Sequence, residues 1–123
     1  TGLEILRRPA MTIEPGEYRA FLAPRALDEI IGMLAWGGLS AKARQTKQSP
    51  LIRMEQGTRL NPQVTLRENT AEGSAPGFQG DVFIKPASVM FIDKGRLAEP
   101  LIAPRTAREY GLISNGANGS ESP

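Results

Sequence analysis

The stretch Ser88–Ile102, SVMFIDKGRLAEPLI, contains two apolar runs joined by a short polar link, and it decides the fold class. The runs are Ser88–Asp93 and Arg96–Ile102, and their Val, Ile, Leu and Phe residues are typical of strands. Lys94 and Gly95 lie between them, and a glycine in a two-residue link is typical of a tight hairpin turn. The stretch therefore predicts an antiparallel β-hairpin.

Further runs of the same kind occur on the N-terminal side of this hairpin. They are Tyr18–Leu22, PLIRMEQ at 50–56, QVTLRE at 63–68 and DVFIK at 81–85. Each is short, carries strand-forming residues and lies near turn residues. The segment Asn69–Gly80 is rich in small and polar residues and predicts a long loop. Together these patterns predict a mostly antiparallel β-sheet.

One amphipathic helix is expected beside this sheet. Its apolar residues follow the i, i+3, i+4, i+7 spacing of a single helix face. They are Leu27, Ile30, Ile31 and Leu34. Pro24 suits the first position of a helix, and the glycines at 37 and 38 are expected to end it. The sequence thus predicts a main helix at about 24–36.

Two short helices are expected at about 40–47 and 104–110. Ser40 is a suitable N-cap for the first of them. Pro104 and Gly111 suit the start and the end of the second. The predicted fold class is therefore α+β, with a mostly antiparallel sheet, one main amphipathic helix and two short helices.

The length of 123 residues fits one domain. We expect residues 1–113 to form a single α+β domain that is a fragment of a larger protein. The last ten residues, 114–123, are SNGANGSESP and include three Ser, two Asn and two Gly. This bias predicts a flexible tail.

The residue types that the chain lacks exclude several kinds of chemistry. It contains no cysteine and no histidine, so it offers no disulfide, no thiolate and no imidazole. Its 15 basic and 13 acidic residues give a net charge of +2, which is too weak to predict direct nucleic-acid binding. There is no apolar run of about 18 residues, so no membrane span is expected. We expect a cytoplasmic protein without a cofactor.

Two pairs of side chains are candidates for chemistry. Asp28 and Glu29 are adjacent on the main helix and point about 100° apart, which favours a solvated helix start over a shared metal ion. Ser40 and Lys42 are candidates for a Ser-Lys pair, but they point to different helix faces. The sequence therefore predicts no catalytic residue, no cofactor-binding residue and no metal ligand.

Two further features are candidates for binding. Lys42, Arg44 and Lys47 share one short helix, for which a solvated face is the favoured interpretation and a weak anionic contact the alternative. Trp36 ends the apolar face of the main helix, beside two glycines. We expect Trp36 to anchor the core. The alternative is a contact with a neighbouring domain or subunit, because tryptophan is enriched at interfaces.

Three parts of the chain occur in the same order as in a known family. They are Leu22–Gln45, Ser49–Met54 and Val89–Gly119, the last containing FIDKGRL at 91–97, PRTAREYG at 104–111 and SNGANG at 114–119. Through this ordered set, which extends over about 100 of the 123 residues, the sequence resembles the TldD/PmbA family, long labelled modulators of DNA gyrase.

The resemblance implies a role in peptide processing. Catalytic TldD-type members are zinc metallopeptidases with His-Glu-x-x-x-His on the helix before the β segment, and they act with a PmbA (TldE) partner that lacks this motif. The corresponding helix here, Ala26–Trp36, contains no histidine, and Glu29 matches the catalytic Glu in type only. The resemblance therefore implies a non-catalytic PmbA/TldE-like subunit. Its expected partners are a TldD-like catalytic subunit or a second copy, with a peptide as substrate.

Two alternatives stay open at this point. The first is a stand-alone binding or structural module with no peptidase role. The second is a metal-independent hydrolase that uses lysine, serine or carboxylate groups in an arrangement that no motif in the sequence indicates.

Overall fold

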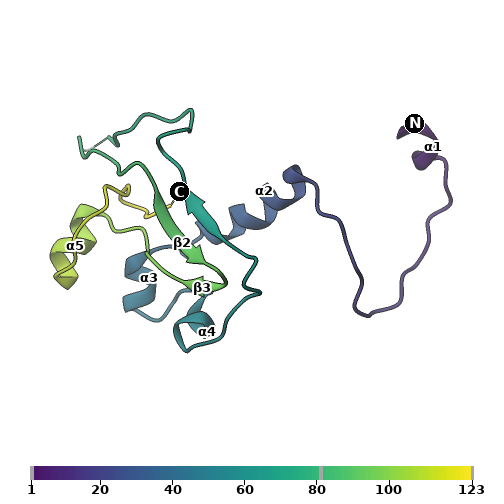
Figure 1. The fold of residues 1–123 in the computed structure, drawn as a ribbon, viewed down its shortest axis with the longest axis horizontal. Helices are drawn as coiled ribbons and strands as arrows, with labels where there is room; N and C mark the ends of the chain where they lie inside the picture. The colour runs from purple at the N-terminus through teal and green to yellow at the C-terminus, as the bar shows by residue number, and fades with distance from the viewer. Residues whose placement is uncertain (1, 81, 123) are drawn as a thin grey trace.

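Three strands form one antiparallel sheet, in the order β1-β2-β3, in the computed structural model, which describes residues 2–80 and 82–122 (Figure 1). The strands are β1 (Leu66–Glu68), β2 (Val89–Asp93) and β3 (Arg96–Leu97). Because β2 lies between the other two, its backbone is hydrogen-bonded on both sides. The sheet and the short helices around it confirm the predicted α+β class.

The predicted hairpin is formed by β2 and β3. Asp93 lies opposite Arg96, and Lys94 and Gly95 form the turn between them. Their φ angles are 44° and 77°. Two successive positive φ values are those of a type I′ turn, whose twist matches that of the flanking strands.

The hydrophobic core is built around β2. Its buried members are Leu39, Val89, Phe91, Ile92, Leu101 and Ala117. Full burial of a side chain of the size of Leu or Phe stabilises a fold by about 1.5–3 kcal/mol. The core therefore joins the central strand to the segment that follows the main helix and to the C-terminal part of the chain.

The three predicted helices are confirmed. The main one is α2 (Pro24–Gly32), and its last turn continues as the 3₁₀ helix η1 (Met33–Ala35). The two short ones are α3 (Ala41–Gln45) and α5 (Pro104–Tyr110).

The ends of the short helices follow from the residues at their caps. At the start of α3, Ser40 Oγ accepts a hydrogen bond from Ala43 N at 3.0 Å. At the end of α5, Gly111 has a φ of 66°, the left-handed conformation in which glycine carries no steric penalty.

One predicted strand is wrong, because the segment 50–56 contains the helix α4 (Ile52–Glu55). Local hydrogen bonds start this helix: Ser49 Oγ accepts from Leu51 N at 3.1 Å, and Ser49 O accepts from Ile52 N at 3.1 Å. Arg, Met and Glu within the turn also favour helix. Met54 on this helix and Leu51 just before it pack against the core.

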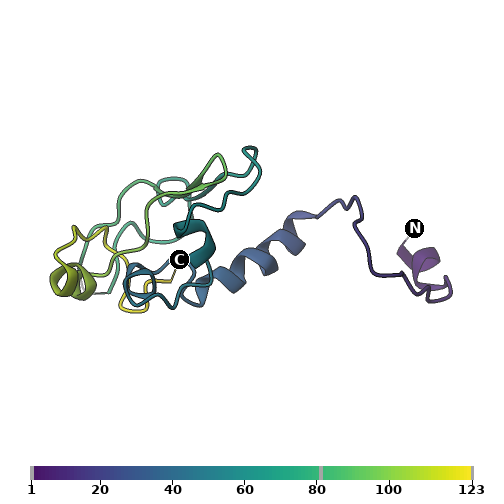
Figure 2. The ribbon, with the colours of Figure 1, turned by 90° about the horizontal axis from the view of Figure 1, so that it is seen from below.

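The strand predicted at Tyr18–Leu22 is also wrong, and a short helix, α1 (Gly2–Leu6), precedes that segment. Phe21 is 92 % exposed. A strand needs a neighbour for its backbone hydrogen bonds, and this segment lies far from the sheet in both views (Figures 1 and 2).

The remaining predicted strands are shorter than expected. Within 63–68, only the last three residues belong to β1. The segment 81–85 contributes a single bridge, between Phe78 and Ile84, and residue 81 lies outside the described residues.

The chain before residue 33 projects away from the sheet. Figures 1 and 2, which differ by 90°, show α2 and the arm before it leaving the body that contains the sheet and helices α3, α4 and α5. In the part of the chain that the structure describes, no helix is long and apolar enough to cross a lipid bilayer.

Candidate interaction site

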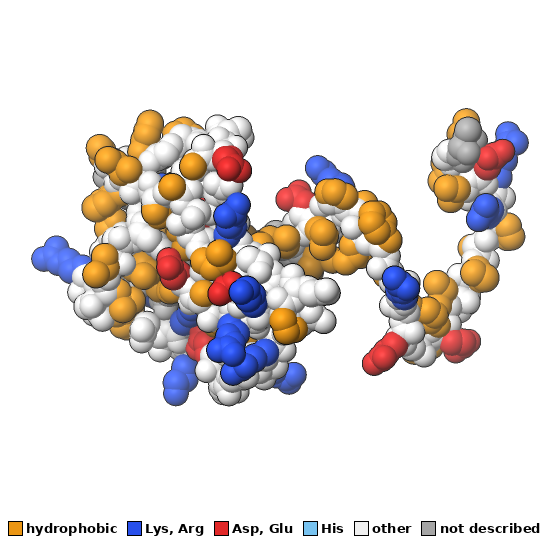
Figure 3. Space-filling model, in the orientation of Figure 1, with side chains coloured by type: hydrophobic (Ala, Val, Ile, Leu, Met, Phe, Trp, Pro, Cys, Tyr) orange, Lys and Arg blue, Asp and Glu red, His pale blue; other side chains and the backbone are white. Residues whose placement is uncertain are grey.

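The apolar face of α2 is exposed along its length. Its side chains are Leu27 (41 % exposed), Ile30 (45 %), Ile31 (37 %) and, in η1, Met33 (65 %). Figure 3 shows hydrophobic side chains along this helix. A helix face with this spacing normally packs on a core, and a contiguous exposed apolar patch marks an interaction site.

Trp36 follows these residues directly after η1, and the prediction that it anchors the core is wrong, because it is 87 % exposed. The chain turns tightly after it: Gly38 N donates to Leu34 O at 2.8 Å, and Leu39 is already buried. A side chain at Gly38 would meet Leu34 O at 2.8 Å, so the turn needs glycine. The alternative, contact with a neighbouring domain or subunit, stays a prediction. We call Leu27, Ile30, Ile31, Met33 and Trp36 the α2 face.

A buried carboxylate holds the start of α3 close to the start of α5. Glu121 is 2 % exposed. Its Oε2 accepts hydrogen bonds from Ser40 Oγ at 2.5 Å and from Lys42 N at 2.9 Å, and its Oε1 accepts one from Ala103 N at 2.8 Å. Thr106 provides a further side-chain hydrogen bond. Glu121 therefore fixes the two helix starts from which α3 and α5 extend.

These contacts set the ionisation of Glu121. Burial by itself would raise the pKa of the carboxyl group. The hydrogen bonds from Ser40 and Thr106 and from the backbone of Lys42 and Ala103 outweigh burial and hold the pKa below its ordinary value. Glu121 is therefore a charged, fully hydrogen-bonded structural group, and its position is one that sequence reasoning missed.

The segment predicted as a flexible tail makes further contacts over its described part. Asn115 Nδ2 donates to Pro100 O at 2.8 Å, and Asn115 Oδ1 accepts from Ile102 N at 2.8 Å. Ser114 Oγ donates to Ile102 O at 2.9 Å. The Ser and Asn residues that suggested flexibility here serve as partners for backbone groups. Mobility of the segment stays a prediction.

The basic residues of the predicted helix at 40–47 do not form one surface. Lys42 on α3 is exposed, whereas Lys47, also exposed, lies beyond the end of α3 with a φ of 57°, so the two do not share one helix as predicted. Arg44 is partly buried, and its Nη1 donates to Ala98 O at 2.9 Å. Burial lowers the pKa of Arg44, and Glu55, whose Oε1 lies 3.9 Å from Arg44 Nε, acts in the opposite direction. Arg44 therefore fixes α3 to the chain after β3.

The other candidate side chains do not form a metal site or a pair of nucleophile and base. Asp28 and Glu29 are both exposed on α2. The hydroxyl of Ser40 is buried and bonded to Glu121, whereas the side chain of Lys42 is exposed. Ser40 and Lys42 thus do not form a nucleophile and its base.

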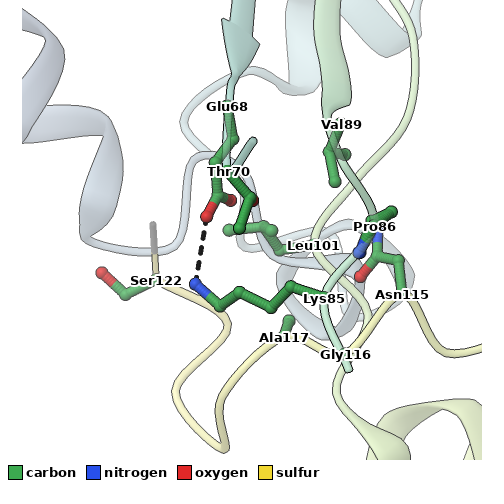
Figure 4. A pocket seen from close by; sticks show the side chains of 10 residues that line it. All are labelled: Glu68, Thr70, Lys85, Pro86, Val89, Leu101, Asn115, Gly116, Ala117 and Ser122. Carbon is green, nitrogen blue, oxygen red and sulfur yellow. Dashed lines mark hydrogen bonds and ion pairs between the residues drawn. The ribbon is translucent and has the colours of Figure 1, made fainter. Parts of the chain in front are cut away.

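A small cavity lies where the end of β1 meets Lys85 (Figure 4). Lys85 Nζ pairs with Glu68 Oε1 at 3.1 Å, and Figure 4 shows the Ser122 hydroxyl pointing away from this amine. Thr70 Oγ1 is buried and has no hydrogen-bond partner. The cavity of about 10 Å³ has room for one water molecule, which Thr70 would bind. It is too small for a peptide side chain.

The fold is an α+β domain whose main helix carries the exposed apolar side chains of the α2 face. A family model described as the PmbA/TldA metallopeptidase C-terminal domain matches residues 15–123. This match covers most of the chain, which therefore belongs to the PmbA/TldD family. Searches among curated proteins and among solved structures gave no match.

The family implies a metal ion. When that ion is zinc, its ligands are usually His, Cys, Asp or Glu side chains. The sequence contains no His and no Cys, and the described residues contain no group of three or more such side chains that could hold a metal ion. These residues do not fit a zinc ion, and we derive no metal-dependent step from them.

Proposed function

We propose that this chain is part of a non-catalytic, PmbA-like subunit of a TldD/PmbA-type peptide-processing complex, and that the α2 face binds the catalytic TldD-type subunit. The observation that carries the proposal is the exposure of that face on the main helix of a domain belonging to a metallopeptidase family.

The residues of α2 support a packing role for this helix. In catalytic relatives, the resemblance places the zinc-binding His-Glu-x-x-x-His on the corresponding helix. Here Ala26–Trp36 contains no histidine and places apolar side chains at helical spacing. A helix without ligands or a nucleophile contributes chiefly through the surface that it buries.

The composition of the α2 face suits a protein interface. Trp is among the residues whose burial contributes most to binding energy at protein interfaces. The Leu, Ile and Met residues that precede it on the helix supply further apolar area, at about 1.5–3 kcal/mol for each side chain that becomes fully buried. The family match begins at residue 15, before α2, so the helix belongs to the family domain and is not a linker to it.

Co-purification tests this proposal. The full-length protein containing this chain is expressed together with a tagged TldD-type subunit, and the complex is isolated and assayed for zinc and for peptidase activity. We expect a stable complex in which zinc and activity depend on the TldD-type subunit. Trp36→Ala and Ile30→Ser should abolish or strongly weaken the complex.

Ile113→Ala is the matched control, because Ile113 is also exposed (89 %) but lies in the body of the chain. This variant should bind like the unchanged protein. Absence of a complex overturns the proposal, and so does tight zinc binding by the isolated protein. Burial of Trp36 in the full-length protein without a partner would also overturn it, because the α2 face would then pack within one chain.

A further inference from the structure

A basic hollow lies beside the β2–β3 turn, on the body and away from α2. Its volume is about 580 Å³, within the range of about 300–1,000 Å³ that is typical of ligand sites. It is lined by Arg59, Leu60, Pro62, Asp93, Lys94 and Arg96. Figure 3 shows Lys and Arg side chains gathered over the region of β3 and α4.

The walls of the hollow are fixed by backbone hydrogen bonds. Leu60 N donates to Gly95 O at 3.0 Å, and Gly95 N donates to Val64 O at 2.8 Å. A side chain at Gly95 would collide with Leu60 O, so the loop and the turn are in close contact. The backbone that carries the lining residues is therefore held in place without a ligand, which lowers the entropy lost on binding.

The charge of the hollow is not neutralised by its own residues. Arg59, Lys94 and Arg96 contribute three positive charges, against the single carboxylate of Asp93. Within residues 2–80 and 82–122, the ion pairs join Arg44 to Glu55 and Lys85 to Glu68, and neither involves these cations. The hollow therefore carries two positive charges in excess and attracts an anionic group.

Lys94 occupies a backbone position that does not favour lysine. Its φ of 44° lies in the left-handed region, where Asn, Asp or Gly is the usual choice in a type I′ turn. This departure from the usual turn residues supports a role for the Lys94 side chain outside the turn.

We propose that this hollow binds an acidic peptide segment, with carboxylates paired to Arg59, Lys94 and Arg96 and apolar groups against Leu60 and Pro62. A peptide fits better than a nucleic acid for two reasons. The lining contains no aromatic side chain on which a base could stack. The chain as a whole has a net charge of only +2, so its field beyond the hollow is weak.

The proposal is independent of the partner of α2. It is tested on the full-length protein without a TldD-type subunit. Failure to bind the peptide would therefore not contradict the proposed complex, and failure to form the complex would not contradict peptide binding. The probe is a fluorescein-labelled peptide of alternating Glu and Leu, and anisotropy measures its binding. The same peptide with Gln in place of Glu, and a labelled oligothymidine, are the comparison ligands.

The variants are chosen so that charge changes without loss of the fold. Lys94→Asn removes a cation and gives the turn a residue that it prefers, so weaker binding cannot be attributed to unfolding. We expect Lys94→Asn to weaken peptide binding about fivefold, which corresponds to the loss of one ion pair in a solvated site. The double variant Arg59→Gln/Arg96→Gln should weaken peptide binding further. Asp93→Asn should strengthen binding by a similar factor. Arg108→Gln, an exposed cation on α5, is the control and should change nothing.

Three results would each overturn the proposal. The first is equal binding of the Glu and Gln peptides. The second is binding that falls as much in Arg108→Gln as in Lys94→Asn, which would indicate a general charge effect. The third is tighter binding of oligothymidine than of the acidic peptide at about 0.15 M salt, which would indicate a nucleic-acid site.

Discussion

Ser40 Oγ donates a hydrogen bond of 2.5 Å to Glu121 Oε2, although the two residues are 81 positions apart in the chain. The same hydroxyl accepts the capping hydrogen bond from Ala43 N, so it serves the helix start and the carboxylate together. The backbone reinforces this junction, because Ala41 N donates to Leu101 O at 2.9 Å. The C-terminal segment thus closes a contact between the first and the last helix of the body.

Replacing Glu121 by Ala should destabilise the fold by about 3 kcal/mol. The change leaves the hydroxyl of Ser40 and the amides of Lys42 and Ala103 without their acceptor, and a buried unsatisfied donor costs about 1–3 kcal/mol. Urea unfolding followed by circular dichroism measures the effect. Glu99→Ala, at an exposed glutamate, is the control and should change the free energy of unfolding by less than about 0.5 kcal/mol. Equal effects of the two substitutions would contradict a structural role for the Glu121 carboxylate.

The stability of the chain should also depend on pH through Glu121. In the folded chain its pKa lies below the ordinary value of 4.5, to which it returns on unfolding. The carboxylate therefore adds stability above pH 4.5, and this contribution is lost as the pH falls through the lower, folded-state pKa. We expect the free energy of unfolding to fall on acidification in the unchanged protein, and to fall less in Glu121→Gln. The two proteins differ only in the carboxyl group of residue 121, so parallel pH profiles would contradict the prediction.

Features that depend on neighbouring residues could be predicted from the sequence. The hairpin follows from Lys94-Gly95 between two apolar runs, and α5 follows from its proline at the start and its glycine at the end. In each case the turn or cap residues lie within a few positions of the element that they define. Local chemistry is then sufficient, because the hydrogen bonds concerned are also local.

Features that depend on distant residues could not be predicted in this way. Nothing near Glu121 in SNGANGSESP indicates that its carboxylate meets Ser40 and Ala103. The apolar run at 50–56 predicts a strand, but Ser49 starts a helix there instead. The spacing of α2 predicted an apolar face correctly, but a helical pattern does not reveal whether the face meets a core or solvent.

Two glycines with similar backbone angles should respond differently to alanine. Gly95 and Gly111 have φ values of 77° and 66°, so each substitution forces an L-residue into the left-handed region at about 1 kcal/mol. At Gly111 a Cβ atom meets nothing within 4 Å, whereas at Gly95 it collides with Leu60 O. We expect Gly95→Ala to cost roughly 3 kcal/mol in all, by chemical denaturation. Similar losses in the two variants would show that the loop at Leu60 moves aside freely.

Trp36 should report directly on occupation of the α2 face, because it is the only tryptophan in the chain and is 87 % exposed. In the isolated chain its fluorescence should have the long-wavelength emission of a solvated indole and should be quenched readily by iodide. Trp36→Phe should leave the urea midpoint nearly unchanged, since the side chain makes little contact with the body. Binding of a tryptophan-free TldD-type subunit should shift the emission to shorter wavelength and protect it from iodide, because the indole leaves water. A complex that forms while Trp36 stays accessible to iodide would place the interface elsewhere on the domain.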